Sequence, residues 1–177
     1  MGAYHLFAVT QKMNNMNYFE LMGLEERPYA DKARLTKNFI ALQRNAHPDK
    51  HAGSNEWELA DKSMLSAEIN KAYAIFKDEH KTLEYFLITK GVIHDDEKYK
   101  LPNDFLMEMM NINEVLEEEG VEAYRKRIAV FAEDIESGVL PFLSGEKEVL
   151  TQEDLALLSE YYFKKKYLNR LLDRIMD

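Results

Sequence analysis

One short stretch of the sequence, positions 47 to 51, holds the side chains best suited to chemistry. His47, Asp49 and His51 alternate there, and imidazole and carboxylate groups are common metal ligands, so one hypothesis is a metal-dependent enzyme that uses these three residues. No second cluster of ligands is visible in the sequence, and Pro48 would have to permit the chelate. A second hypothesis is an ordinary connection between two helices. A third is an exposed turn that presents an imidazole, a carboxylate and the ammonium group of Lys50 to a partner protein.

The segment that leads into this turn is amphipathic. Its apolar residues recur at intervals of four, three and four positions, which is the pattern of one helical face: Leu35, Phe39, Leu42 and Ala46. Basic residues share a different face, called the basic face below: Arg34, Lys37 and Arg44. Pro48 ends the pattern, because proline has no N–H to donate and disfavours helical geometry in the residue before it. The sequence therefore predicts a buried helix with a basic outer face, followed directly by a rigid exposed turn.

The composition indicates a helical protein with a real core. The chain has 177 residues, enough for one ordinary domain or two small ones, and 46% of them are hydrophobic. Charged residues make up 31%, whereas there are only 7 Gly and 4 Pro, which favours helices over a turn-rich β fold. No stretch approaches the ~20 apolar residues of a membrane span, so we expect no membrane association. The sequence has no cysteine, which excludes disulfides and a cysteine nucleophile and is compatible with a cytoplasmic location.

The net charge of −9 is spread unevenly along the chain. Residues 1–80 hold 10 Lys or Arg and 11 Asp or Glu, whereas residues 81–177 hold 13 and 21. An acidic second half argues against a phosphate-binding surface and therefore against nucleic acid as the main partner. The basic face is then a local feature, suited to an acidic patch on another protein.

Helix-ending signals divide the chain into segments. Residues 1–15 are uninformative, 16–80 form a first domain, 81–102 a connector helix and linker, and 103–177 a second domain. Helices are expected over 18–22, 31–46, a segment through Ile69, and 77–90, which ends at Gly91. The second domain is predicted to be an antiparallel three-helix bundle. Its first helix is capped by Asn103 or Asp104 and ends at Gly120, and its second helix ends at Gly138. A loop over 139–150 leads to the last helix, which Thr151 caps together with Asp154.

The helix near residues 105–118 has more hydrophobic surface than one packing face needs. Its buried face is expected to be formed by Phe105, Met109, Ile112 and Leu116. Three apolar residues remain on another side of this helix, and two acidic residues continue that side. The set is called the outer face of this helix: Leu106, Met107, Met110, Glu114 and Glu118. Either the connector helix covers these residues or they form a partner surface, for which an apolar patch with an acidic rim is a recurrent signal.

The order of these features resembles a known family. A short aromatic helix, an amphipathic helix, the His-Pro-Asp turn and a third helix resemble a J-domain, the module that stimulates DnaK-type chaperone ATPases. With the aromatic connector and the acidic bundle, residues 16–175 resemble the HscB-type co-chaperones of iron–sulphur cluster assembly. The resemblance is carried by Tyr18-Phe19-Glu20-Leu21, Leu42-Gln43-Arg44, His47-Pro48-Asp49-Lys50, Ile69-Asn70-Lys71-Ala72, Glu84-Tyr85-Phe86-Leu87 and Phe105-Leu106-Met107-Glu108.

The resemblance implies an all-α adaptor with no catalytic residue, cofactor or metal of its own. The J-domain would engage a DnaK/HscA-type chaperone of the heat-shock seventy class, with the turn His47, Pro48, Asp49 and Lys50 stimulating its ATPase and the basic face docking on acidic patches. The second domain would bind an IscU-type iron–sulphur scaffold protein through the outer face of the helix near residues 105–118 and through Tyr167. A J-domain co-chaperone with a different client protein is the alternative.

The sequence departs from the family pattern in three places. Ala46 stands before the turn where an aromatic residue is usual. Asp78-Glu79 and Thr82, after the third helix, replace a common Pro and Arg. Asn111 stands where an acidic scaffold contact is frequent. Because Ala46 is smaller than an aromatic residue, we expect looser packing behind the turn. Asn111 removes one negative charge from the expected scaffold contact.

Overall fold

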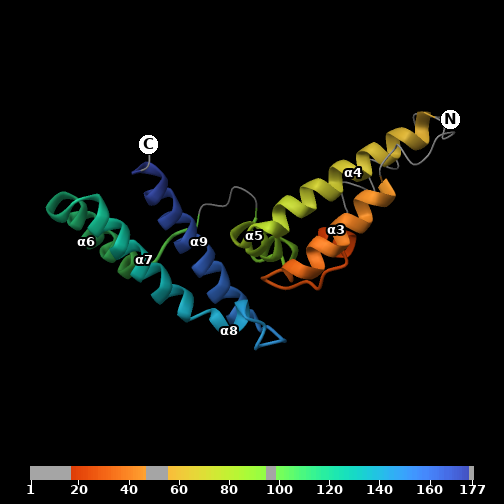
Figure 1. Ribbon diagram of the computed structural model, residues 1–177. Coiled ribbons are helices and arrows are strands. Elements are labelled where there is room, and N and C mark those ends of the chain that lie inside the picture. The colour runs from red at the N-terminus through yellow and green to blue at the C-terminus, as the bar shows by residue number, and fades with distance from the viewer. Residues whose placement is uncertain (1–16, 47–55, 95–98, 176–177) are drawn as a thin grey trace. The chain divides into compact units, whose positions relative to one another are not determined.

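The computed structural model describes residues 17–46, 56–94 and 99–175 and is helical throughout its regular structure (Figure 1). These described ranges contain no strand, which confirms the predicted all-α class. None of the helices in them is long and apolar enough to cross a bilayer. The chain divides into two compact units, Met1–Thr82 and Leu83–Asp177, and each is described by itself.

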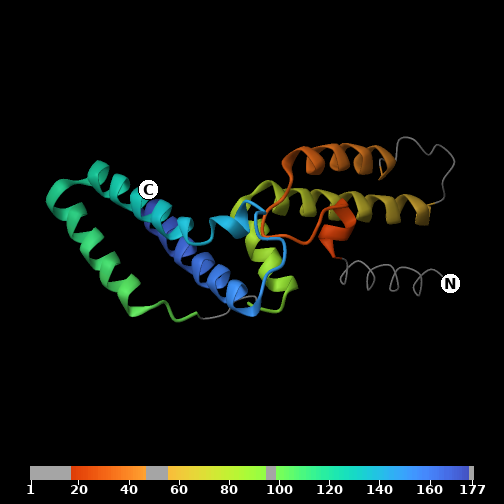
Figure 2. The same cartoon turned by 90° about the horizontal axis from the view of Figure 1, so that it is seen from below.

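The N-terminal unit is built on an antiparallel pair of helices. α3 (Lys32–Ala46) and α4 (Glu56–Lys77) lie side by side, and the short α2 (Tyr18–Met22) packs against both (Figures 1 and 2). Aromatic rings join the three helices, with 4.6 Å between the ring centroids of Phe19 and Phe76 and 4.0 Å between those of Phe39 and Tyr73. The apolar stripe that the spacing predicts for α3 therefore contributes to a core that α2 and α4 also build.

Side chains satisfy the exposed ends of these helices. The Asp31 carboxylate accepts hydrogen bonds from the backbone N–H groups of Ala33 and Arg34, so α3 begins one residue later than expected and Asp31 caps it. Lys32 donates to the carbonyls of Phe76 and Lys77 at 3.1 and 3.0 Å, which satisfies the C-terminal end of α4.

The helix α5 (Glu79–Thr89) ends in a left-handed glycine, as predicted. Gly91 has φ 66°, and the N–H of Val92 donates to the carbonyl of Leu87 at 3.0 Å, the 6→1 bond of a Schellman motif. The part of α5 within the C-terminal unit is held to that unit by polar contacts. The Tyr162 hydroxyl donates to the Glu84 carboxylate, and Lys166 donates to the Tyr162 hydroxyl at 2.9 Å.

The C-terminal unit has three long helices and one short one. α6 (Asn103–Glu119) and α7 (Val121–Ser137) are joined at Gly120, and α9 (Gln152–Arg174) packs against α7. Their shared core contains seven buried side chains: Phe105, Met109, Ile112, Tyr124, Ile128, Leu168 and Leu171. The predicted buried face of α6 is thus confirmed, with Leu116 partly buried beside it.

Two local predictions for this unit are wrong. The N-cap of α6 is Pro102, which has no side chain to offer, and neither Asn103 nor Asp104 occupies that position. The segment expected to be a loop over 139–150 contains α8 (Leu140–Leu143). Pro141 is tolerated in the first turn of this helix, and burial of Val139 and Phe142 stabilises the turn.

The start of α9 is a capping box, as the sequence predicts. The Thr151 hydroxyl accepts from the N–H of Asp154 at 3.3 Å, and the Asp154 carboxylate accepts from the N–H of Thr151 at 2.7 Å. Lys147 pairs with the same carboxylate at 2.6 Å. The hydrogen bond from Lys147, followed by that from the backbone of Thr151, lowers the pKa of Asp154.

Removing the cap should destabilise the protein measurably. We expect Thr151→Ala to lower the free energy of unfolding by about 1 kcal/mol, because a backbone N–H of α9 loses its acceptor. Urea denaturation followed by circular dichroism measures this loss. The control is Gln152→Ala at the next, exposed position, and equal stability of the two variants would contradict the assigned cap.

The Asp154 carboxylate should make stability depend on acid. Its pKa is lower in the folded chain than in the unfolded chain, so its contribution is complete above the unfolded value of about 3.9 and is lost as the pH falls through the folded value. We expect Asp154→Asn to be less stable than the wild type at pH 7 and to lose less stability on acidification. Urea midpoints measured between pH 7 and pH 2 test this, and parallel curves for the two proteins would refute it.

Candidate partner-binding surfaces

The basic face of α3 is exposed because its opposite side packs in the core. Leu35 is 1% exposed, whereas the three basic side chains, Arg34, Lys37 and Arg44, are all exposed. Within the described part of the chain, no salt bridge joins any of these three to another residue. Their charges are therefore available to a partner.

An apolar residue that the sequence analysis did not single out lies within this basic face. Ile40 is 60% exposed and lies three positions after Lys37 and four before Arg44, so the three side chains neighbour one another on the helix. The signal was present in the sequence, because Ile40 falls outside the apolar stripe of α3. The surface therefore combines positive charge with one exposed aliphatic side chain.

The His-Pro-Asp turn lies outside the described residues, as do all three residues of the metal-site hypothesis, His47, Asp49 and His51. Among the residues that are described, no group of three or more His, Asp or Glu side chains could hold a metal ion. Ala46, directly before the turn, is 2% exposed, so the small side chain at this departure from the family pattern is packed in the core.

The two sides of α6 differ sharply in exposure. Phe105 and Met109 are 3% and 1% exposed, whereas Met107 and Met110 are both 66% exposed and Leu106 is 38% exposed. Glu114 and Glu118 continue the exposed side. The described structure therefore leaves the predicted outer face of this helix open to solvent, and it is called the α6 outer face from here on. A surface of flexible thioethers beside carboxylates is suited to an adaptable contact with another protein.

Tyr167 is half-buried on α9 and faces the inner side of α6. Its ring meets that of Phe105 edge-on, with 5.7 Å between the centroids, and Lys164 lies 5.7 Å from the same Phe105 centroid. The structure thus ties Tyr167 to the packed side of α6 through its contact with Phe105.

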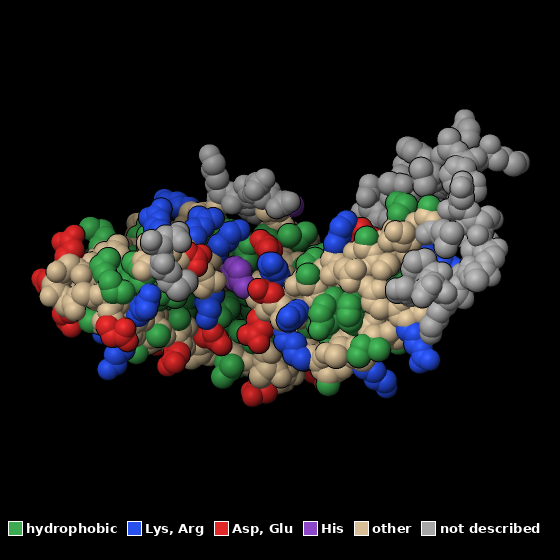
Figure 3. Space-filling model, turned by 45° about the horizontal axis from the view of Figure 1, so that its top comes forward, with side chains coloured by type: hydrophobic (Ala, Val, Ile, Leu, Met, Phe, Trp, Pro, Cys, Tyr) green, Lys and Arg blue, Asp and Glu red, His purple; other side chains and the backbone are tan. Residues whose placement is uncertain are grey.

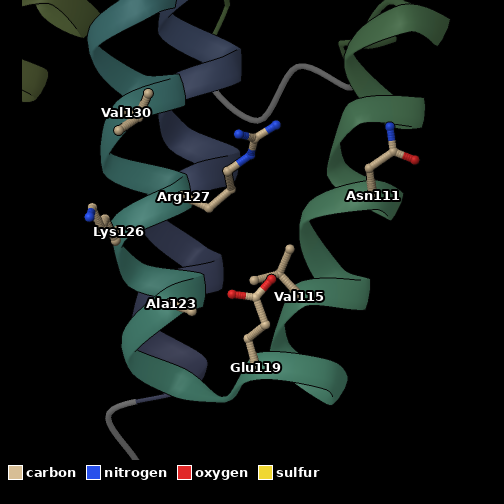
Figure 4. Close-up of a pocket in the computed structure, with 7 residues that line it drawn as sticks. All are labelled: Asn111, Val115, Glu119, Ala123, Lys126, Arg127 and Val130. Carbon is tan, nitrogen blue, oxygen red and sulfur yellow. The ribbon is translucent and has the colours of Figure 1, made fainter.

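A shallow groove runs between α6 and α7 and was not predicted from the sequence (Figure 4). Its volume is about 380 Å³, and Asn111, the third departure from the family pattern, is one of its lining residues. Val115 and Glu119 point from α6 toward α7, and Arg127 points from α7 toward α6 (Figure 4). The sequence signal was Val130 on α7, an apolar lining residue outside the buried stripe of its helix.

The charge of the α6–α7 end of the C-terminal unit is mixed. Acidic side chains gather where α6 turns into α7 (Figure 3), and exposed basic residues follow on α7: Arg125, Lys126 and Arg127. Arg127 lies 3.5 Å from the carboxylate of Glu108 across the groove. The arrangement offers charge and apolar contact area for binding a protein.

Comparisons with known proteins identify relatives for both units. Residues 101–176 match the family model described as the HSCB C-terminal oligomerisation domain. A co-chaperone protein HscB homolog from Shewanella halifaxensis is 31% identical over 170 residues, which covers 90% of this chain and 95% of that protein. A homolog from Vibrio cholerae is 39% identical over 103 residues, but this match spans only 60% of that protein and 58% of this chain.

Solved structures extend the comparison to the fold. The chaperone HscB from Vibrio cholerae is similar with a TM-score of 0.62 and 28% identity, covering 91% of this chain and 96% of that one. The human co-chaperone protein HscB is similar in fold, with a TM-score of 0.73 and 24% identity, covering 92% of this chain and 81% of that one.

The two sides of α6 should respond differently to truncation. We expect Met109→Ala to lower the free energy of unfolding by about 2–5 kcal/mol, because it leaves a cavity in the core. Met107→Ala, at a position 66% exposed, should change it by less than about 0.5 kcal/mol. Urea denaturation of both variants measures the contrast. A large loss of stability in Met107→Ala would show that this side chain is packed.

Proposed function

The chain belongs to the family of HscB co-chaperones, and on that premise we propose that it links two proteins. The first is a DnaK/HscA-type chaperone, whose ATPase the N-terminal unit stimulates. The second is an IscU-type iron–sulphur scaffold protein, which the C-terminal unit delivers to the chaperone. The chain acts as an adaptor in this proposal, and ATP hydrolysis belongs to the chaperone.

The exposed cations of the basic face support the chaperone half of the proposal. Arg34, Lys37 and Arg44 present three positive charges along one side of α3, and such charges chiefly accelerate and orient the encounter with an acidic partner surface. Ile40 adds an apolar contact among them. The proposal assigns stimulation to His47 and Asp49 in the turn that follows α3.

One observation carries the scaffold half: α6 buries one side completely and still exposes two methionines and a leucine on the other. The packing of the unit does not need these side chains, because Phe105, Met109 and Ile112 already bury α6 against its neighbours. Exposed apolar side chains rimmed by carboxylates are typical of a protein contact. We therefore propose the α6 outer face as the scaffold-binding surface.

The two halves can be tested in one assay. We measure steady-state ATP hydrolysis by a DnaK/HscA-type chaperone with this protein and an IscU-type scaffold added separately and together. We expect stimulation by this protein and a further gain with the scaffold. Asp49→Ala should abolish the stimulation, whereas Glu20→Ala, an exposed carboxylate elsewhere in the same unit, should retain it. Circular dichroism of each variant verifies its fold.

Each failure has a distinct meaning. Stimulation by this protein without a gain from the scaffold would retain the chaperone half and assign the C-terminal unit to a different client protein. Full stimulation by Asp49→Ala would contradict the role of the turn. No response from the folded wild-type protein would overturn the chaperone half.

A further inference from the structure

The groove between α6 and α7 borders the α6 outer face. Asn111 lies next to Met110 in the chain and one turn after Met107, and Glu119 follows Glu118. A protein that covers the exposed methionines therefore reaches the edge of the groove within one helical turn. The groove continues from there across to α7 (Figure 4).

The α6 outer face alone is small for a specific interface. A standard protein–protein interface covers about 800 Å² on each partner and about 20–30 residues a side. The outer face offers three apolar side chains, of which Leu106 is only 38% exposed, together with two carboxylates. A partner bound there must extend onto adjoining surface, and the groove is adjoining surface with an apolar lining of Val115, Ala123 and Val130.

The groove has a distinctive charge pattern. Its α6 side carries Glu119, and on its α7 side Arg127 points toward α6, whereas Lys126 points away from α6 at the outer edge of the groove (Figure 4). Arg127 approaches Glu108 at 3.5 Å, but its side chain remains 58% exposed, so several of its five N–H donors are left for another carboxylate. Arg127 thus gives the groove a positive charge close to the acidic turn between α6 and α7, and this difference in charge can orient a partner segment.

We propose that this groove is the second half of the scaffold-binding surface, an inference that rests on the proposed function. A segment of the iron–sulphur scaffold protein lies across the groove. It places an aliphatic side chain against the apolar lining that includes Val115 and Val130, and a carboxylate beside Arg127. The charge of Lys126 attracts the same carboxylate from the outer edge of α7. The exposed methionines supply an adaptable apolar contact, and the groove sets the direction in which the scaffold lies.

A second copy of this chain is a poorer occupant. Residues 81–177 carry 13 basic and 21 acidic residues, so two C-terminal units have a net charge of the same sign, which opposes their association. A partner with its own basic surface for Glu114 and Glu118, and with one acidic segment for Arg127, avoids that repulsion.

The test measures the binding of an IscU-type scaffold to the full chain by titration calorimetry. We expect Val130→Glu to weaken binding roughly tenfold, because it places a carboxylate in the apolar lining opposite the acidic segment. Lys126→Glu should weaken it at low salt, with a smaller effect at 0.3 M salt because exposed charges are screened. The matched control is Leu157→Glu on α9, an apolar residue 51% exposed compared with 55% for Val130, which should bind like the wild type.

A parallel measurement separates the two proposals. Met107→Ala should weaken binding, and all these variants should retain stimulation of the chaperone when no scaffold is present. If Met107→Ala loses affinity while Val130→Glu and Lys126→Glu bind like the wild type, the groove is not part of the surface and the proposed function stands. If the wild type binds no scaffold, both proposals fail.

Two further outcomes are decisive. Analytical sedimentation of the wild type and of Val130→Glu tests whether a second copy occupies the groove. The groove proposal is overturned if the wild type self-associates, Val130→Glu does not, and the two bind the scaffold with equal affinity. If Val130→Glu unfolds, the exposed Lys126→Glu decides the question, because its effect does not depend on the apolar lining.

Discussion

The packing of Phe105 against two other helices is the constraint on which the C-terminal unit depends. Its ring centroid lies 5.8 Å from that of Phe131 on α7 and 5.7 Å from that of Tyr167 on α9. Met109 continues the same side one turn further on and is buried. Because successive residues of a helix are turned by about 100°, this burial directs Leu106, Met107 and Met110 outward. The α6 outer face is thus a geometric consequence of a well-packed core.

In the N-terminal unit, too, the burial of one side of a helix exposes the opposite side, which here is basic. Leu35 and the ring pair of Phe39 and Tyr73 bind α3 to α4, which leaves Arg34, Lys37 and Arg44 facing solvent. The protein therefore presents one basic helical face and one apolar face with acidic neighbours, on different units. Faces of opposite sign select different partners, because each repels what the other attracts. This is the property that an adaptor between two proteins requires.

Several contacts that define the two units join residues far apart in the sequence. The Tyr18 hydroxyl donates to Glu68 at 2.7 Å, and Lys165 donates to Glu136 at 3.0 Å. Burial alone would raise the pKa of Glu136, but the hydrogen bonds from Lys165 and Tyr161 lower it, so this carboxylate is charged and holds α9 to α7 at neutral pH. Such contacts contribute little to which residues are helical, but they fix how one helix is positioned against the next.

The sequence by itself determined the long helices, their buried stripes, the Gly91 and Thr151 ends, and the apolar residues of α6 that its packing does not need. All of these depend on residues within about four positions of one another, where helical period and capping rules apply. The tertiary structure alone decided that Val139 and Phe142 pack to form α8 and that Tyr167 rests on Phe105. It also decided the groove, because the residues that line it come from two helices. No local pattern specifies how closely α6 and α7 approach, since that distance is set by the core beneath them.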